Sequence, residues 1–143
     1  MQTPVEAAAS LLQSYARAVL DKDVQAFADL YHPDVCIFDT WGVWSYDDAQ
    51  AWAGMAREWF AALPATERVV VTWDGLQARQ FGDALSVQAF LTYTAMTDQG
   101  EKIRAMTNRL SWVVQRDGDA LQVVHEHTSA PADHESGKVI LQR

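Results

Sequence analysis

A tyrosine and an aspartate in the first third of the chain are the residue pair best suited to proton chemistry. Tyr15 lies on the apolar stripe of a predicted helix, together with Val19. Asp39 follows a predicted strand, whose alternation places it on the face of Val35 and Ile37. Burial disfavours the charged form of a carboxylate and raises its pKa towards that of a useful general base. We predict that Tyr15 and Asp39 are catalytic residues facing one interior space; the alternative is a core tyrosine and an aspartate that caps the next turn.

Two histidines near the end of the chain are the next candidates. His125 and His127 stand two residues apart in a predicted strand, so both are expected on the face of Val123, while Glu126 points the other way. We predict that His125 carries a proton or hydrogen-bonds a ligand and that His127 binds the ligand; the alternative is that protein acceptors satisfy both rings. No third ligand stands at a recognisable spacing, so we expect neither a metal nor a cofactor.

The predicted strand over residues 103–116 offers an amide and two guanidinium groups. Arg104 and Arg109 lie on opposite faces by parity, so one of them is expected on the concave side, where it would bind a carboxylate. Arg109, near the middle of the strand, is the preferred ligand-binding candidate; the alternative is a surface ion pair. Asn108 is the nearest neutral donor in this strand, which contains no Asp or Glu.

Large aromatic side chains complete the predicted cavity. Trp59 and Phe60 have core spacing on a predicted helix and are expected to lie across the sheet, and Trp41 stands in a loop beside Gly42. A few polar groups among many aromatic ones are typical of a ligand site. We therefore predict that Trp41, Trp59 and Phe60 contact a ligand.

The spacing of apolar residues predicts helices first and strands afterwards. A helix is expected from a capping box at Thr3 to about residue 20, a short one from residue 23 to 31, and a third from a capping box at Ser45 to Pro64. The expected strands cover residues 35–39, 68–74, 76–81, 85–97, 103–116 and 120–129. This order predicts an α+β fold with helices on one face of a curved antiparallel sheet.

The composition narrows the possible binding partners and the expected cellular location of the protein. The chain has 143 residues, which suits a single domain over residues 1–143 with a tail at 132–143, either frayed or an added edge strand. A net charge of -8 argues against nucleic acid as a partner. No apolar run is long enough to span a membrane, and no signal peptide is present, so we expect a cytoplasmic protein. Cys36, the single cysteine, excludes an internal disulfide.

The closing segment Val123-Val124-His125-Glu126-His127-Thr128-Ser129-Ala130-Pro131, with the element order, resembles the SnoaL-like families of the nuclear-transport-factor-2-like superfamily. It is most similar to the branch that includes the association domain of calcium/calmodulin-dependent protein kinase II, although Leu121 stands where that branch usually has Trp. The resemblance implies a cone-shaped domain, in which a strongly bent sheet wraps a long helix. Tyr15 and Asp39 also resemble the tyrosine and base aspartate of ketosteroid isomerase, but residues 103–116 lack its second acid.

Two functions remain open from the sequence. The first is binding of a small apolar compound, with isomerase- or cyclase-type proton transfer on a carbonyl or carboxylate substrate. The alternative is an association module that forms homo-oligomers without catalysis. The outward positions Gln88, Phe90, Thr92 and Thr94 are uncharged, which predicts a covered sheet face and therefore a homodimer or larger assembly.

Overall fold

The computed structural model describes residues 2–143, which form three helices and five strands. In chain order these are α1 (Pro4–Leu20), α2 (Val24–Ala28), β1 (Tyr31–Phe38), α3 (Ala49–Ala62), β2 (Glu67–Phe81), β3 (Ala84–Thr97), β4 (Lys102–Asp117) and β5 (Ala120–Ser129).

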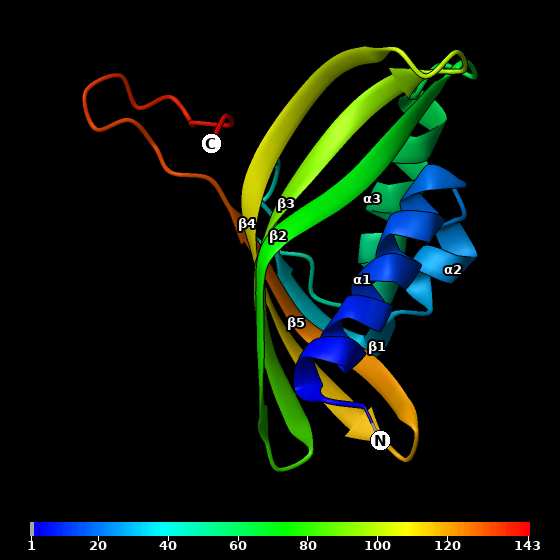
Figure 1. Cartoon of the computed structure of the whole chain (residues 1–143), viewed down its shortest axis with the longest axis vertical. Coiled ribbons are helices and arrows are strands. Elements are labelled where there is room, and N and C mark those ends of the chain that lie inside the picture. Colours follow the sequence, from blue (N-terminus) through cyan, green and yellow to red (C-terminus); the bar gives the residue numbers. More distant parts are fainter. Residues whose placement is uncertain (1) are drawn as a thin grey trace.

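The five strands form one curved sheet with the helices gathered on a single face of it (Figure 1). The strand order is β1-β5-β4-β3-β2; β1 runs parallel to β5, and all other neighbours are antiparallel. The predicted α+β class is therefore confirmed, with a mixed sheet because β1 adds to the edge of β5. The opposite face of the sheet carries no helix from the described part of the chain.

The first helix begins where the sequence predicts because its cap is complete. The amide of Glu6 donates to Thr3 Oγ1 over 3.1 Å, and the amide of Thr3 donates to the Glu6 carboxylate over 2.9 Å. These two bonds satisfy amides that would otherwise lack partners at the helix start. Leu12, Tyr15 and Val19 then form the buried stripe that packs against the sheet.

The start of α3 differs from the prediction. Asp48, not Ser45, is its N-cap, since the Ala51 amide donates to Asp48 Oδ1 over 2.8 Å. The Ser45 hydroxyl instead donates to Asp47 over 2.8 Å. A short carboxylate directly before the first turn is an equally good cap, and it leaves the preceding residues free to form a loop.

The two strands predicted at residues 68–74 and 76–81 are one strand, β2. Its register with β3 shifts between Asp74 and Gln77, and Gly75 there has a φ of +64°. A Cβ atom on Gly75 would lie 3.0 Å from the ring of Phe90, so both the conformation and the space require glycine. The Asp-Gly pair therefore makes a bulge in a continuous strand and does not separate two strands as predicted.

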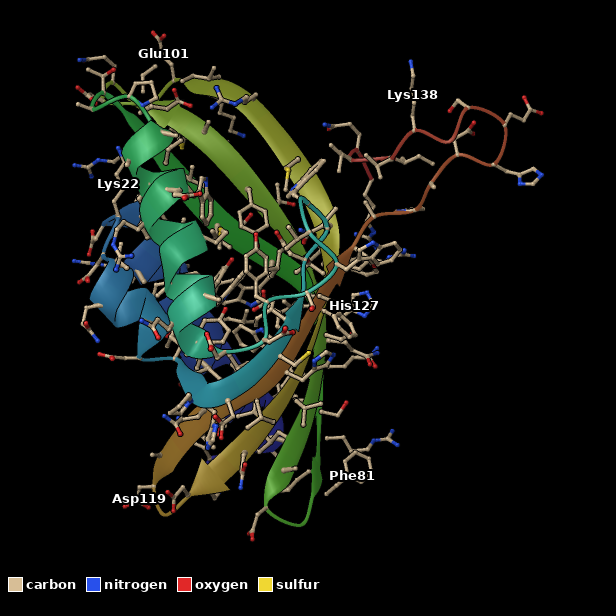
Figure 2. All side chains as sticks on the ribbon, turned by 180° about the vertical axis from the view of Figure 1, so that it is seen from behind. Lys22, Phe81, Glu101, Asp119, His127 and Lys138 are labelled. Atoms are coloured by element: carbon tan, nitrogen blue, oxygen red, sulfur yellow. The ribbon has the colours of Figure 1, made fainter. Side chains whose placement is uncertain are left out.

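A second irregularity decides which side chains of β5 face the helices. The register of β5 with β4 shifts by one residue at Val124. An extra residue reverses the alternation of side chains beyond it. Consequently Val123 and Glu126 are both buried on the inner face, and His125 and His127 lie on the outer face (Figure 2).

The tail at residues 132–143 is neither frayed nor a regular edge strand. Ala132 pairs with Val139 in an isolated bridge, and the Thr107 amide of β4 donates to the Leu141 carbonyl oxygen over 2.7 Å. The tail thereby returns to the edge of β4 beyond the end of its pairing with β5. As for membrane insertion, none of the helices in residues 2–143 has both the length and the apolar character that crossing a bilayer requires.

Candidate functional site

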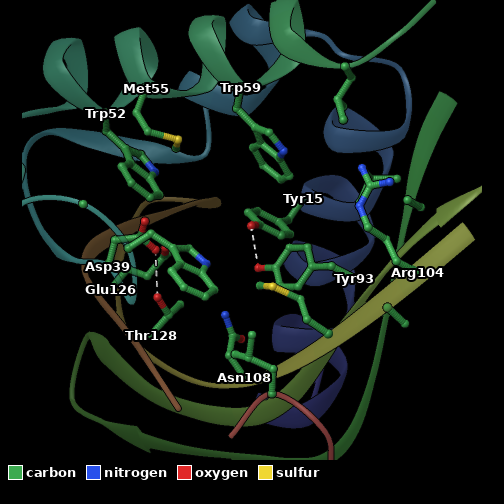
Figure 3. A pocket seen from close by; sticks show the side chains of 18 of the residues that line it. Tyr15, Asp39, Trp52, Met55, Trp59, Tyr93, Arg104, Asn108, Glu126 and Thr128 are labelled. Atoms are coloured by element: carbon green, nitrogen blue, oxygen red, sulfur yellow. Dashed lines mark hydrogen bonds between the residues drawn. The ribbon is translucent and has the colours of Figure 1, made fainter. Parts of the chain in front are cut away.

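The helices and the inner face of the sheet surround a cavity of about 600 Å³ (Figure 3). This volume lies within the range of small-molecule sites, and most of the wall is aromatic or aliphatic, as in such sites. The lining residues are Tyr15, Asp39, Trp41, Gly42, Tyr46, Trp52, Met55, Trp59, Leu63, Val69, Tyr93, Ala95, Arg104, Ala105, Met106, Asn108, Glu126, Thr128 and Leu141.

Five of the residues predicted to share a cavity do so. Tyr15, Asp39, Trp41, Trp59 and Asn108 all line it. They come from α1, the end of β1, the following loop, α3 and β4, so five separate segments converge on one space. Their catalytic and ligand-binding roles stay predictions.

The predicted inward position of His125 and His127 is wrong. His125 Nδ1 donates to the Cys36 carbonyl oxygen over 2.8 Å, and both imidazoles pack edge-on against Phe38 on the outer face. The shift at Val124 is the physical reason, because it exchanges the two faces of β5 after Val123. Within residues 2–143, no three His, Cys, Asp or Glu side chains gather in a way that could hold a metal ion.

The predicted cavity positions of Arg109 and Phe60 are wrong too. Arg109 follows the inward Asn108 in β4, so it points outward, where its Nε donates to the Ser129 hydroxyl over 3.0 Å. Phe60 is buried below the cavity wall, with its ring centroid 6.0 Å from that of Phe27 on α2. Neighbouring helical residues point about 100° apart, so only Trp59 of this pair reaches the cavity.

Arg104 is the arginine that lines the cavity. Its guanidinium forms an ion pair with Glu67, a residue of β2 that is only 7% exposed. Parity had placed Arg104 and Arg109 on opposite faces correctly, but the choice between them was wrong. Since Glu67 already neutralises Arg104, the cavity wall offers no unpaired cation among the described residues.

Two tyrosine hydroxyls form the central donor group. The hydroxyl oxygens of Tyr15 and Tyr93 are 2.9 Å apart, and they point into the cavity (Figure 3). Burial raises the pKa of both phenols, so both keep their protons at neutral pH. One hydroxyl hydrogen makes the mutual bond, and the second is left to point at a ligand.

Asp39 stands at the other side of the same space. Its Oδ1 accepts a bond from the Thr128 hydroxyl over 2.9 Å. Burial raises the pKa of Asp39, against the lowering effect of the Thr128 hydroxyl and of the nearby Thr40 and Trp41 amides. Asp39 is therefore a partly desolvated carboxyl group that hydrogen bonds keep in place. This arrangement fits a general base, and it also fits a residue that caps its turn.

Glu126 is a second carboxyl on the cavity wall, and the sequence prediction missed it. It is only 1% exposed, and its Oε1 accepts bonds from Tyr31 Oη and Trp112 Nε1, each over 2.7 Å. Burial raises the pKa of Glu126 to about 7; Asp39 raises it as well, while the two donors lower it. At neutral pH this group holds a proton about half of the time.

Two fully buried polar atoms of residues in the wall make no hydrogen bond within residues 2–143. They are Trp52 Nε1 and Asn108 Oδ1, and their residues are 3% and 5% exposed. Leaving a buried polar atom unpaired costs free energy, so such atoms are rare in folded proteins. Both atoms belong to residues that line the cavity, although the atoms themselves are buried.

The sequence contains a signal for two of the missed lining residues. Tyr93 and Trp52 have the correct period for inward positions in β3 and α3. Leu141 could not have been placed, because its position depends on the path of the tail. For Glu126, only the shift at Val124 reverses the expected direction, and no glycine or proline marks that shift.

A bent sheet with its helices on one face and a ligand-sized cavity between them defines a cone-shaped α+β protein with an internal pocket. The chain belongs to the SnoaL-like domain family, whose family model matches residues 8–133. The predicted family is therefore confirmed. No curated protein matches the chain.

Solved structures share this fold at low sequence identity. A nuclear-transport-factor-2-like protein of unknown function from Pseudomonas putida superposes with a TM-score of 0.79 at 22% identity, covering 96% of this chain and 93% of that one. A putative calcium/calmodulin-dependent protein kinase II association domain from Xanthomonas campestris gives 0.75 at 16% identity, over 91% and 89%. A putative aromatic ring hydroxylase from Novosphingobium aromaticivorans gives 0.72 at 20% identity, over 90% and 91%. The resemblance to ketosteroid isomerase stays a prediction.

The unpaired oxygen of Asn108 predicts a stabilising substitution. Asn108→Leu keeps a branched side chain of four heavy atoms and removes a buried acceptor without a partner, so we expect the free energy of unfolding to rise by about 1–2 kcal/mol. Thr107→Val is the matched control in the same strand, because the Thr107 hydroxyl is paired with that of Thr92 at 2.9 Å. It should lower the free energy by about 1 kcal/mol. Urea unfolding measures both, and a loss of stability in Asn108→Leu would contradict the prediction.

The raised pKa of Glu126 predicts how stability depends on pH. Its pKa rises from 4.5 to about 7 on folding, so between these values the folded chain binds more protons than the unfolded chain. The free energy of unfolding should therefore fall as pH rises through this window, by about 3 kcal/mol from this group. In Glu126→Gln, whose amide oxygen still accepts from Tyr31 and Trp112, that fall should disappear.

Urea unfolding at pH 5 and pH 8 measures this difference. Glu101→Gln, at an exposed turn, serves as the control and should keep the pH dependence of the unsubstituted chain. Equal pH dependence in Glu126→Gln and the unsubstituted chain would show that Glu126 titrates in its ordinary range.

Proposed function

We propose that this protein binds a neutral, largely apolar carbonyl compound in the cavity and catalyses a proton transfer on it. The observation that carries the proposal is one cavity wall that combines the Asp39 carboxyl with the Tyr15–Tyr93 hydroxyl pair among aromatic rings. A general base and a donor to a developing oxyanion are the two groups that such a reaction needs.

The charges of the wall favour a neutral compound over a carboxylate. Asp39 and Glu126 both place acidic groups in the cavity, and the Arg104 guanidinium is paired with Glu67. A bound carboxylate would meet like charges without a free cation, and that arrangement is unfavourable at low dielectric. Arg109, the predicted carboxylate partner, points away from the cavity. A solved structure with this fold is described as a putative aromatic ring hydroxylase, which agrees with an apolar, ring-shaped ligand.

The proposed step moves one proton and leaves the ligand an isomer of itself. The Asp39 carboxylate removes a proton from a carbon next to the carbonyl group, and the electron pair moves onto the carbonyl oxygen. The free hydroxyl hydrogen of the Tyr15–Tyr93 pair stabilises that enolate oxygen. Protonated Asp39 then returns its proton to the same or another carbon of the conjugated system.

Replacing Asp39, the proposed base, should abolish hydrogen exchange at the carbon next to the carbonyl group and leave the fold intact. The probe is 2-acetylnaphthalene in deuterium oxide, and proton NMR follows deuterium incorporation at its methyl group. We expect Asp39→Asn to lower the rate at least 100-fold, the usual size of general-base catalysis, with unchanged circular dichroism. Asp98→Asn, at an exposed turn outside the cavity, is the control and should keep the full rate. Exchange at the buffer rate with the unsubstituted protein would refute the proposed activity.

The association of two copies remains a second proposal, because the outer sheet face exposes apolar side chains around β1, β5 and β4. Phe38 and Val113 on this face are 41% and 40% exposed, next to the imidazoles of His125 and His127. A second copy of the chain is the occupant that we propose, since one self-complementary patch suffices for a two-fold dimer. Such a dimer leaves the cavity free, because the cavity lies between the helices and the other face of the sheet.

Sedimentation equilibrium at micromolar concentration tests the association. We expect about twice the chain mass of 16.0 kDa, and we expect Val113→Asp to give the monomer mass because it buries an unpaired charge in the interface. Gln13→Asp, on the exposed side of α1, is the control and should leave the mass unchanged. A stable monomer for the unsubstituted chain would remove the association proposal.

A further inference from the structure

We propose that Glu126 is a second functional carboxyl group of the cavity, whose protonated Oε2 donates a hydrogen bond to an acceptor oxygen of the ligand. This inference rests on the proposed binding of a neutral carbonyl compound and adds a residue and a regulation by pH to it. Three features of the structure support it: the direction of the side chain, the use of its two oxygens, and the groups around it.

The direction of Glu126 follows from the shift in β5. Without the extra residue at Val124, Glu126 would lie on the outer face with Phe38 and Val113. The shift turns the carboxyl inward, where it lines the cavity together with Thr128 (Figure 3). A bulge that places an acidic group inside an apolar wall has an evident cost, so a function for that group is the natural explanation.

The two carboxyl oxygens of Glu126 have different surroundings. Oε1 accepts from both Tyr31 and Trp112. Oε2 makes no hydrogen bond within residues 2–143. It is also not one of the fully buried polar atoms without a partner, so it is accessible from the open space of the cavity. A proton on this group therefore resides on Oε2, because Oε1 already faces two donors. In that state Oε2 offers a hydroxyl hydrogen to the cavity.

The titratable groups that face Glu126 keep its pKa near neutral pH. They are Tyr15 of α1, Tyr31 of β1, Tyr93 of β3 and Asp39 at the end of β1; α3 contributes no titratable group to the cavity wall. These four groups are neutral or negative, so none favours the ionised form of Glu126 by its charge. Tyr46 also lines the cavity, and the one cation of the wall in residues 2–143, Arg104 of β4, is paired with Glu67. The pKa of about 7 is consistent with an acid that is mostly neutral below this pH and mostly ionised above it.

Two carboxyl groups in one cavity then take different roles. Asp39 keeps hydrogen bonds that favour its ionised form, from the Thr128 hydroxyl above all. Glu126 is more deeply buried and is pushed further towards its neutral form. Environments that separate two pKa values in this way assign one group as a base and the other as a donor.

A neutral fluorescent ketone tests the inference directly. The probe is 6-propionyl-2-dimethylaminonaphthalene, and its emission reports both binding and hydrogen bonding to the carbonyl oxygen. We expect its affinity for the unsubstituted protein to fall about tenfold from pH 6 to pH 8, in proportion to the protonated fraction of Glu126. Glu126→Gln should bind as tightly at pH 8 as at pH 6, because its amide group can donate at every pH. Glu101→Gln should behave like the unsubstituted protein.

A second probe without the acceptor separates hydrogen bonding from general effects of pH. N,N-dimethyl-2-naphthylamine has the same ring system and no carbonyl group, so its affinity should not depend on the state of Glu126. Equal pH dependence for both naphthalenes, or for the unsubstituted protein and Glu126→Gln, would overturn the inference and leave the cavity as a binding site. Failure of both probes to bind at any pH would overturn the inference together with the proposed function.

Carbon-13 NMR of glutamate-labelled protein gives a check that needs no ligand. The carboxyl signal that disappears in Glu126→Gln should titrate near pH 7. Titration near the ordinary value of about 4.3 would overturn the inference even if ketones bind.

Discussion

The burial of one carboxyl group, Glu126, constrains much of the interior. Its Oε1 holds Tyr31 of β1 and Trp112 of β4, the strands on either side of β5. A buried carboxyl group without such donors would be very costly, so both rings must keep their places. The Trp112 ring in turn packs edge-on against Tyr15 of α1, and the Tyr31 ring packs edge-on against Trp52 of α3. One hydrogen-bonded group thus fixes three strands and sets the position of two helices relative to the sheet.

Two local departures from regular strand geometry decide which side chains of β2 and β5 face the interior. At Gly75 the bulge in β2 makes room for the Phe90 ring and keeps β2 and β3 together along their length. At Val124 the extra residue turns Glu126 inward and sends His125 to the outer face. Neither departure changes the order of the strands. Both change which chemical groups reach the interior, and for that reason the same fold can hold quite different sites.

Periodicity predicted the fold, and five of the nine site residues predicted from the sequence line the cavity. Tyr15, Asp39 and Asn108 reach the cavity because a period of 3.6 or 2 holds over the residues directly before them. His125 failed because a one-residue shift exchanges the faces of a strand and leaves no mark in the sequence. The family resemblance helped with the architecture only, since it rests on core positions that relatives with different sites share.

The unsatisfied polar groups of the interior are not scattered. In the core, the Trp112 nitrogen has Glu126 as acceptor and the Thr92 and Thr107 hydroxyls bond each other, so the chain can pair its buried polar atoms. The Asn108 oxygen and the Trp52 nitrogen lack partners, and both belong to residues that line the same cavity as Glu126. A chain selected for stability alone would fill these positions with apolar side chains. Because this cost falls on residues that line one cavity, the simplest physical account is that the polar groups of the wall serve the function of that cavity.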